Sequence, residues 1–144
     1  MATATMETSW TDPAQVTGAL SRKVLQYGDI IERTVKAAKL PGFTKDTGWS
    51  ELEALLSPDF ERVGNDKARM GWAVYKELLT GWATTTDFWS HFHRIGEAGN
   101  CVFLELTEHN TPVGGKQSVV NSLSLYEFDE AGKLVHLDIY LQHD

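Results

Sequence analysis

The apolar residues in the first third of the chain repeat with the spacing of one helix face. They recur every three or four positions between Asp12-Pro13 and Leu40-Pro41, namely at Val16, Leu20, Val24, Tyr27, Ile31 and Val35. Asp12 is suited to cap a helix, Pro13 is tolerated in its first turn, and Pro41 would end it. The pattern therefore predicts one long helix over residues 13–40.

Two further helices and a short strand are predicted before residue 88. In "SELEALL", Ser50 and Glu53 match the S-x-x-E capping box, in which two side chains satisfy free backbone amides at a helix start. "FERVG" is short, compatible with β structure and bounded by turns. "MGWAVYKELLTGW" returns to helical spacing, with apolar positions at Trp72, Tyr75, Leu78, Leu79 and Trp82.

From Phe88 onward the apolar period changes to two, which is typical of strands. Four strands are predicted over 88–96, 101–109, 117–128 and 134–142. The segments "EAGN", "NTPVGGK" and "DEAGK" between them contain the Gly, Pro, Asn and Asp residues that turns require. The order predicts an α+β fold, with three N-terminal helices packed on one face of a curved antiparallel sheet. We expect a flexible N-terminus over 1–11 and a single domain over 12–144.

Composition and charge narrow the classes of partner. The chain has 144 residues, 42% of them hydrophobic and 23% charged, which is ordinary for a globular domain. Its net charge of -7 opposes nucleic acid or an anionic membrane as a partner, because both attract clustered Lys and Arg. Cations and neutral molecules remain as possible partners.

The cellular context is predicted from what the sequence lacks. Cys101 is the only cysteine, so no internal disulfide is possible, and the first ten residues resemble no secretory signal. No apolar run approaches the roughly 18 residues of a membrane span. We therefore expect a cytoplasmic protein that does not enter a membrane.

The segment "WSHFHRIGEAGNCVFLELTEHN" contains the candidate chemistry. If "AG" at 98–99 is a two-residue hairpin turn, His93 pairs with Leu104, His91 with Leu106, and Trp89 with Glu108. One face of the hairpin then carries two imidazoles and a carboxylate. This group suits proton transfer. Two other interpretations also fit the spacing: a metal site, for which such spacing is weak evidence, and histidines that simply line the sheet.

The order of elements, with "HRIGEAGNCVFLELTEHN" and "FDEAGKLVHLDIYLQ", resembles the NTF2-like superfamily. Within it, the chain looks like the SnoaL-like polyketide cyclases and the limonene-epoxide-hydrolase-like group. The resemblance implies a cone whose sheet wraps a cavity and a homodimer formed through the outer sheet face. It leaves the activity open, because the superfamily includes isomerases, dehydratases, cyclases, epoxide hydrolases and proteins without catalysis.

Catalytic positions of that group are only partly retained. Leu106 and Glu108 stand where the epoxide hydrolases have an arginine and an aspartate. Ile139 stands where those hydrolases, and the cyclases, carry an acid on the last strand, and Glu61 falls near a water-holding position. The usual hydrolase arrangement is therefore not expected. A slip of one residue in the last strand would turn Asp138 inward instead.

The resemblance also implies which face lines the cavity. The expected lining is Trp89, His91, His93, Glu108 and Leu106, with Ser122, Ser124 and Tyr126 from the next strand, Glu61 from beneath, and Leu137 and Ile139 as an apolar wall.

Roles follow from the chemistry of these side chains. We expect His91 or His93 to act as the base, Glu108 as its partner or as the acid, and Tyr126 as a hydrogen-bond donor, with Asp138 as the candidate if the last strand slips.

The predicted function is acid–base isomerisation, cyclisation or dehydration of a hydrophobic polyketide or terpenoid intermediate, with no cofactor and no metal. Two alternatives stay open. One is a non-catalytic protein that binds a hydrophobic small molecule. The other is an epoxide hydrolase with a rearranged acid pair.

Overall fold

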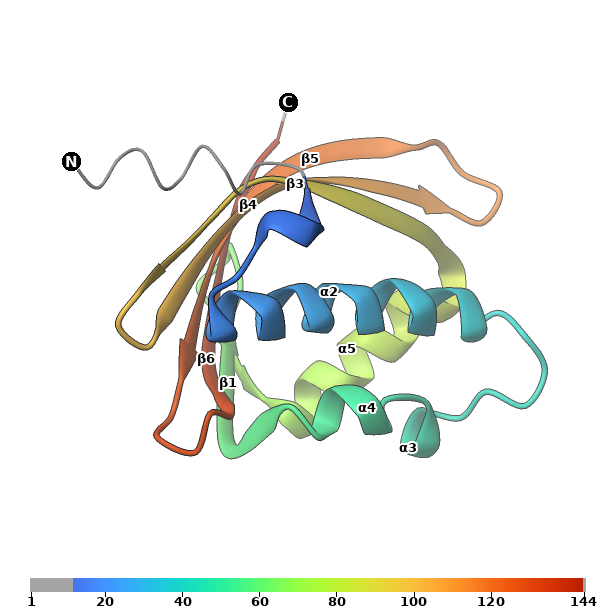
Figure 1. Ribbon diagram of the computed structural model, residues 1–144. Helices are drawn as coiled ribbons and strands as arrows, with labels where there is room; N and C mark the ends of the chain where they lie inside the picture. Colours follow the sequence, from blue (N-terminus) through green and yellow to red (C-terminus); the bar gives the residue numbers. More distant parts are fainter. Residues whose placement is uncertain (1–11, 144) are drawn as a thin grey trace.

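A curved sheet forms one side of the molecule and wraps partly around its helices (Figure 1). The computed structural model describes residues 12–143. Within them the sheet has six strands in the order β2-β1-β6-β5-β4-β3. The bounds are β1 Leu56–Val63, β2 Arg69–Gly71, β3 Thr86–Ala98, β4 Cys101–Pro112, β5 Ser118–Phe128 and β6 Leu134–Gln142. Strands β3 to β6 are the predicted antiparallel meander, whereas β1 runs parallel to β6.

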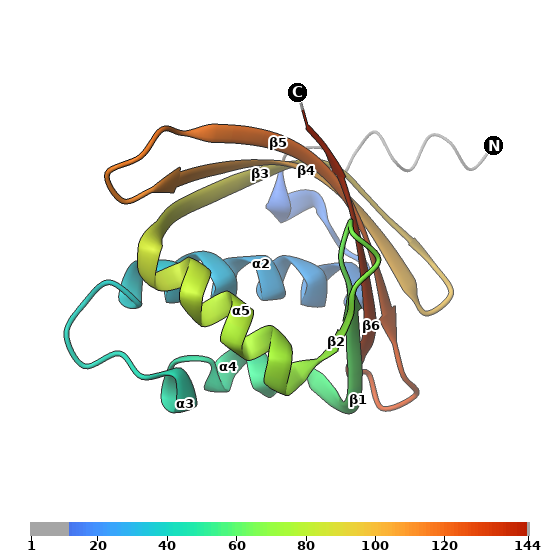
Figure 2. The ribbon, with the colours of Figure 1, turned by 180° about the vertical axis from the view of Figure 1, so that it is seen from behind.

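Helices α2 and α5 cross the concave side of the sheet (Figures 1 and 2). The helical elements in the described part of the chain are η1 Pro13–Gln15, α2 Ala19–Ala37, α3 Lys45–Gly48, α4 Ser50–Glu53 and α5 Trp72–Thr85. The α2 stripe predicted from spacing is largely buried, including Val24, Tyr27, Ile31 and Val35. No helix between residues 12 and 143 is long and apolar enough to cross a membrane.

The long N-terminal helix begins later than the sequence predicts. Asp12 caps only the short 3-10 turn η1, where its Oδ1 accepts from the Ala14 amide at 3.0 Å. The chain is then extended through Val16, and α2 starts at Ala19. There Glu97, from β3, accepts from both the amide and the hydroxyl of Ser21, at 2.9 and 2.7 Å. A residue 76 positions away therefore satisfies a free amide in the first turn of α2, which local spacing does not reveal.

The capping box predicted at Ser50 and Glu53 is wrong. Trp49 is the residue before α4, and the Ser50 hydroxyl donates to the Thr47 carbonyl at 2.8 Å. The buried Trp49 indole donates to Thr80 Oγ1 at 2.9 Å. Trp49 thus separates the two short helices α3 and α4 and joins this region to α5.

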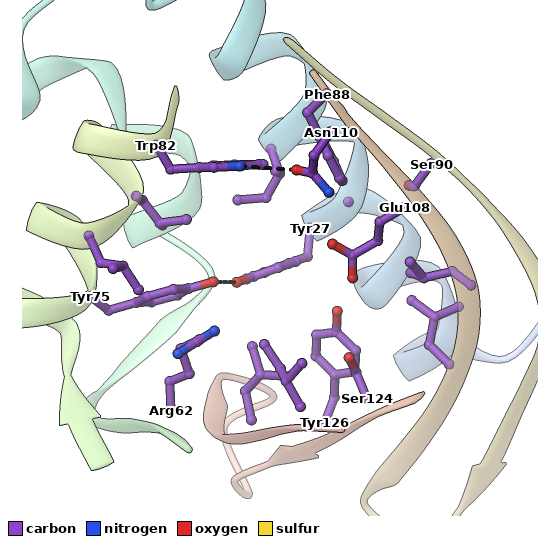
Figure 3. A pocket seen from close by; sticks show the side chains of 18 residues that line it. Tyr27, Arg62, Tyr75, Trp82, Phe88, Ser90, Glu108, Asn110, Ser124 and Tyr126 are labelled. Carbon is purple, nitrogen blue, oxygen red and sulfur yellow. Dashed lines mark hydrogen bonds between the residues drawn. The ribbon is translucent and has the colours of Figure 1, made fainter. Parts of the chain in front are cut away.

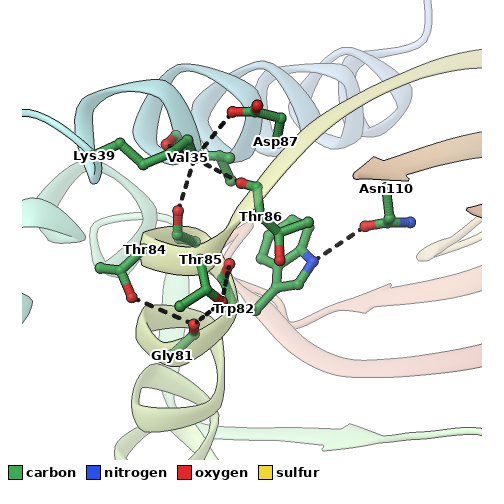
Figure 4. Close-up of polar contacts among 10 residues, drawn as sticks. Val35, Lys39, Gly81, Trp82, Thr84, Thr85, Thr86, Asp87 and Asn110 are labelled. Atoms are coloured by element: carbon green, nitrogen blue, oxygen red, sulfur yellow. Dashed lines mark hydrogen bonds and ion pairs between the residues drawn. The ribbon is translucent and has the colours of Figure 1, made fainter. Parts of the chain in front are cut away.

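Lys39 joins the C-terminal end of α2 to the junction of α5 and β3 (Figure 4). Its ammonium group donates to the carbonyls of Val35, Ala83 and Thr86 at 2.6, 2.8 and 2.6 Å, and it lies 3.7 Å from the Asp87 carboxylate. Free carbonyls at helix ends favour a cation. One side chain thus contacts α2, α5 and β3 together.

Candidate functional site

A mainly apolar cavity of about 330 Å³ lies between the concave face of the sheet and helices α2 and α5 (Figure 3). Leu104 and Leu106 of β4, Leu137 and Ile139 of β6, and Ile31 of α2 supply part of its apolar wall. The polar groups that enter it are few, which is typical of a small-molecule site. They are Tyr27, Arg62, Tyr75, Ser90, Glu108, Asn110, Ser124 and Tyr126.

Glu108 provides the only carboxylate among the described residues that line the cavity. It lies on β4, opposite Ser90 of β3, and its side chain points inward (Figure 3). Burial raises the pKa of Glu108 above its ordinary value, while the nearby Ser122 hydroxyl and the Arg62 guanidinium lower it. The shift moves the pKa of this carboxyl toward neutral pH, which favours a group that must both accept and return a proton.

Tyr126 of β5 points its hydroxyl into the cavity toward Glu108 (Figure 3). Burial, followed by the neighbouring Tyr75 and Glu108, raises the pKa of Tyr126 well above its usual range. The phenol is therefore neutral at ordinary pH and can donate a hydrogen bond. Ser124 lies two residues earlier on the same face of the strand.

Tyr27 of α2 and Tyr75 of α5 both line the cavity, and a hydrogen bond of 2.7 Å joins their hydroxyls. The Tyr27 ring packs edge-on against Tyr126, with centroids 5.5 Å apart, and Tyr75 stacks on Phe60. Burial raises the pKa of both phenols. This pair links the two helices across the cavity and places two neutral hydroxyls in its wall.

Arg62 of β1 is the one cation among the described residues that line the cavity. Its guanidinium carbon lies 5.1 Å from the centroid of the Tyr75 ring. On the other side of the cavity, the Trp82 indole donates to Asn110 Oδ1 at 3.1 Å, and its ring packs edge-on against Phe88. The site therefore has a charged end at Arg62 and a neutral amide–indole pair at Asn110 (Figure 3).

The predicted placement of Trp89, His91 and His93 in the cavity is wrong. The hairpin turn lies at 99–100 rather than 98–99. Each residue of β3 near the turn therefore pairs two positions further along β4 than predicted, and its side chain stays on the predicted face. A β-bulge at His93 then interrupts the alternation, so Phe88 and Ser90 face inward beyond it. A bulge inserts one unpaired residue, and every side chain past it changes face.

These three side chains form a ring cluster on the outer face of the sheet. Trp89 stacks on His109 with ring centroids 3.7 Å apart, and His91 lies 5.5 Å from His109. His93 Nε2 is 2.6 Å from Thr107 Oγ1, which donates to Asn121. Because Glu108 points to the opposite face, it cannot complete a metal site with this histidine pair. Within residues 12–143, no group of three or more His, Cys, Asp or Glu side chains is arranged to hold a metal ion.

The last strand keeps the register expected without a slip. Ile139 and Leu137 line the cavity, and Asp138 lies on the outer face, where its carboxylate accepts from His136 at 3.0 Å. The alternative in which Asp138 turns inward is therefore wrong. Glu61 is also outside, within 2.6 Å of Arg69 and 3.5 Å of His136.

The remaining predicted residues lie on the inner face. Leu106, Glu108, Ser124 and Tyr126 line the cavity, and Ser122 is buried on the same face of β5 without lining it. Their roles stay predictions.

Sequence reasoning missed Arg62, Tyr27, Tyr75, Trp82 and Asn110. Asn110 continues the inward alternation of Leu106 and Glu108, so extending that pattern by one step would have found it. Arg62 is the inward neighbour of the predicted Glu61, and only the pairing of β1 with β6 decides between them. Tyr27, Tyr75 and Trp82 are predicted only as apolar positions of helices. Spacing carries no information on the hydrogen-bond partners of their hydroxyl and indole groups.

Comparison with known proteins identifies the fold. No protein-family model and no curated protein sequence matches the chain. Among solved structures, an NTF2-like protein of unknown function from Exiguobacterium sp. 255-15 has a TM-score of 0.67 at 14% identity, covering 84% of this chain and 98% of that one.

Two matches have more specific descriptions. An LEH-like epoxide hydrolase from M. tuberculosis has a TM-score of 0.57 at 21% identity, over 80% of this chain and 84% of its own. A protein provisionally assigned as a SnoaL-like polyketide cyclase from Shewanella putrefaciens CN-32 has a TM-score of 0.69 at 9% identity, over 88% and 91%. At such identities the likeness establishes the fold alone. The resemblance expected from the sequence is thus confirmed at that level, and the chain has the NTF2-like fold.

Proposed function

We propose that the protein is a cofactor-independent acid–base enzyme that isomerises, cyclises or dehydrates a hydrophobic carbonyl compound of the polyketide or terpenoid kind. One observation carries the proposal: the Glu108 carboxyl, with a raised pKa, faces the neutral Tyr126 hydroxyl inside a mainly apolar cavity. Titratable groups with perturbed pKa values in a cleft are candidates for catalysis. In this proposal Glu108 is the base, a role expected of His91 or His93 from the sequence, with Glu108 as their partner or as the acid.

The chemistry follows from these two groups. Glu108 removes a proton from the carbon next to the substrate carbonyl, and the C–H electron pair moves to the oxygen to form an enolate. Tyr126 donates a hydrogen bond to that oxygen, where negative charge develops. Return of the proton from Glu108 to another carbon of the conjugated system completes an isomerisation. Attack of the enolate carbon on a second carbonyl, whose oxygen takes the proton from Glu108, gives cyclisation. Departure of a β-hydroxyl group, which takes the same proton and leaves as water, gives dehydration.

The test does not require the natural substrate. The protein is incubated in deuterated water with 2-tetralone, a hydrophobic ketone with exchangeable α-hydrogens, and deuterium uptake is followed by mass spectrometry. We expect the wild type to accelerate exchange and Glu108→Gln to reduce the rate by about 100-fold or more, because general-base catalysis typically contributes that much.

Glu105→Gln is the matched control for this experiment. Glu105 lies on the same strand but on the outer face, where it pairs with Arg94, so its replacement is expected to leave exchange unchanged. Equal exchange by the wild type and Glu108→Gln would exclude Glu108 as the base.

The alternative of a non-catalytic binding protein is supported by Ile139, an apolar residue where the resembling cyclases and hydrolases carry an acid. Under that alternative the wild type binds 2-tetralone but does not accelerate exchange. An epoxide hydrolase with a rearranged acid pair needs two carboxylates near one water, and Glu108 alone is available among the described lining residues. We therefore place hydrolysis third.

A further inference from the structure

Arg62 brings a permanent positive charge into the cavity without a carboxylate partner. Its Nε atom is buried and has no hydrogen-bond partner. Nη1 makes a long contact of 4.0 Å with the Met70 sulfur. Burial raises the pKa of the Tyr75 hydroxyl, and a hydrogen bond from the guanidinium lowers it. No ion pair joins Arg62 to a carboxylate in the part of the chain that the structure describes. A guanidinium offers five donors in a planar fork, and its buried Nε donor is left without a partner.

The surroundings of Arg62 compensate its charge only weakly. The Tyr75 ring provides a cation–π contact, with 5.1 Å between the guanidinium carbon and the ring centroid. Asp66 lies near the same turn, but its carboxylate accepts from the Ala68 amide. Glu108 acts on Arg62 only across the cavity, without a direct contact. Burying a donor or a charge without a partner costs free energy, and a ligand anion would offset that cost.

We infer that the ligand of this cavity carries a carboxylate group that binds Arg62, with the rest of its skeleton against the apolar wall. A carboxylate matches the planar guanidinium fork, which can donate two parallel hydrogen bonds to it. Arg62 and Glu108 enter the cavity from different sides (Figure 3), so a ligand held at Arg62 extends toward Glu108 and Tyr126. The inference rests on the proposed function only in taking this cavity as the substrate site.

A pair of probes that differ only in charge tests this inference. Binding of 2-naphthylacetate and of neutral 2-naphthylacetamide is measured by isothermal titration calorimetry at a pH where the acid is ionised. We expect the wild type to bind the carboxylate at least about 10-fold more tightly, because a hydrogen bond to a charged group is worth that much or more. Arg62→Gln is expected to abolish the preference, and Arg62→Lys, which keeps the charge but loses the fork, to retain part of it.

Arg69→Gln is the matched control, because Arg69 lies on the neighbouring strand β2 and pairs with Glu61 outside the cavity. It should keep the wild-type preference. Equal binding of both probes by the wild type, no detectable binding of the carboxylate, or a preference that persists in Arg62→Gln would overturn the inference. If Arg62→Gln does not fold, the wild-type ratio and Arg62→Lys decide, and an Arg62→Lys preference equal to the wild type overturns the planar-fork assignment.

Glu108→Gln separates this inference from the proposed function. The variant lacks the proposed base but keeps Arg62, so it is expected to prefer the carboxylate at least as strongly as the wild type. A carboxylate preference in a protein that does not accelerate exchange would support the Arg62 subsite and count against the enzyme. Accelerated exchange without a carboxylate preference would support the enzyme and count against the Arg62 subsite.

Discussion

Glu108 couples the chemistry of the cavity to the stability of the fold. Its folded-state pKa lies above the ordinary 4.5 because burial disfavours the charged form. The folded protein therefore holds this proton more tightly than the unfolded chain does. The resulting contribution to stability is fully present below the unfolded pKa and is lost as pH rises through the folded pKa.

This linkage gives a pH prediction for Glu108→Gln, whose side chain stays neutral. The free energy of unfolding of the variant minus that of the wild type should increase as pH rises from about 4.5 toward neutrality, with a slope of at most about 1.4 kcal/mol per pH unit. Urea unfolding curves of both proteins at several pH values measure it. A difference independent of pH would mean that Glu108 ionises as freely in the folded state as in the unfolded chain.

Glu105→Gln again provides the contrast. The hydrogen bond from Arg94 lowers the pKa of Glu105, so its contribution is present above the unfolded pKa and lost as pH falls through the folded pKa. Its replacement should therefore matter least in acid, which is the opposite trend to that of Glu108→Gln.

Some side chains of the sheet could be placed on the correct face from the sequence, and others could not. Glu108, Ser124 and Tyr126 follow the regular alternation of β4 and β5, and each lies on the predicted face. His91 fails the same reasoning because the bulge at His93 lies between it and the turn. The alternation of side chains between the two faces predicts the correct face only where no bulge interrupts the strand pairing.

At the scale of elements, the fold depends on long-range polar contacts between α2 and the edge strand β3. Glu97 caps the start of α2 at Ser21, and Glu32 of α2 accepts from the Ser90 amide of β3 at 2.7 Å. Lys39 closes the far end at Thr86 and Ala83 (Figure 4). These contacts cover part of an edge strand that would otherwise expose unpaired backbone groups.

Replacement of Lys39 tests this attachment. Lys39→Met removes the donor to three carbonyls and is expected to lower the free energy of unfolding by about 2–4 kcal/mol, given the usual worth of hydrogen bonds from charged groups. Lys36→Met, on the exposed side of the same helix, is the control and should change it by less than about 0.5 kcal/mol. Equal effects in urea unfolding would show that the Lys39 contacts contribute nothing specific.

At the scale of the whole molecule, the outer sheet face has an exposed apolar character. Phe103, Leu123 and Tyr140 are 42%, 46% and 57% exposed. Leu123 pairs with Glu105 on one side and with Tyr140 on the other, so these residues form a continuous surface. Exposed apolar patches of this kind often mark contact sites. The homodimer expected from the family resemblance stays a prediction that this surface favours.

A charge placed on that surface tests the dimer. We expect the wild type to sediment as a dimer at micromolar concentration and Leu123→Lys to sediment as a monomer, because each copy of a two-fold interface would bury the new charge. Val74→Lys is the control, since Val74 is 58% exposed on α5, away from the sheet. A monomeric wild type would contradict the prediction.

The α+β order of elements and the four-strand meander could be predicted from the sequence alone. These features follow from periodicity and turn residues, which are local properties of the chain. The NTF2-like fold could likewise be anticipated from that order.

The composition of the cavity depends on contacts between distant segments of the chain. The bulge at His93 moved two histidines outside, the pairing of β1 with β6 chose Arg62 over Glu61, and the meeting of α2 with α5 brought Tyr27 to Tyr75. Each of these depends on contacts between segments far apart in sequence. The free energy of such contacts depends on packing and hydrogen bonding in three dimensions, which no local spacing along the chain records.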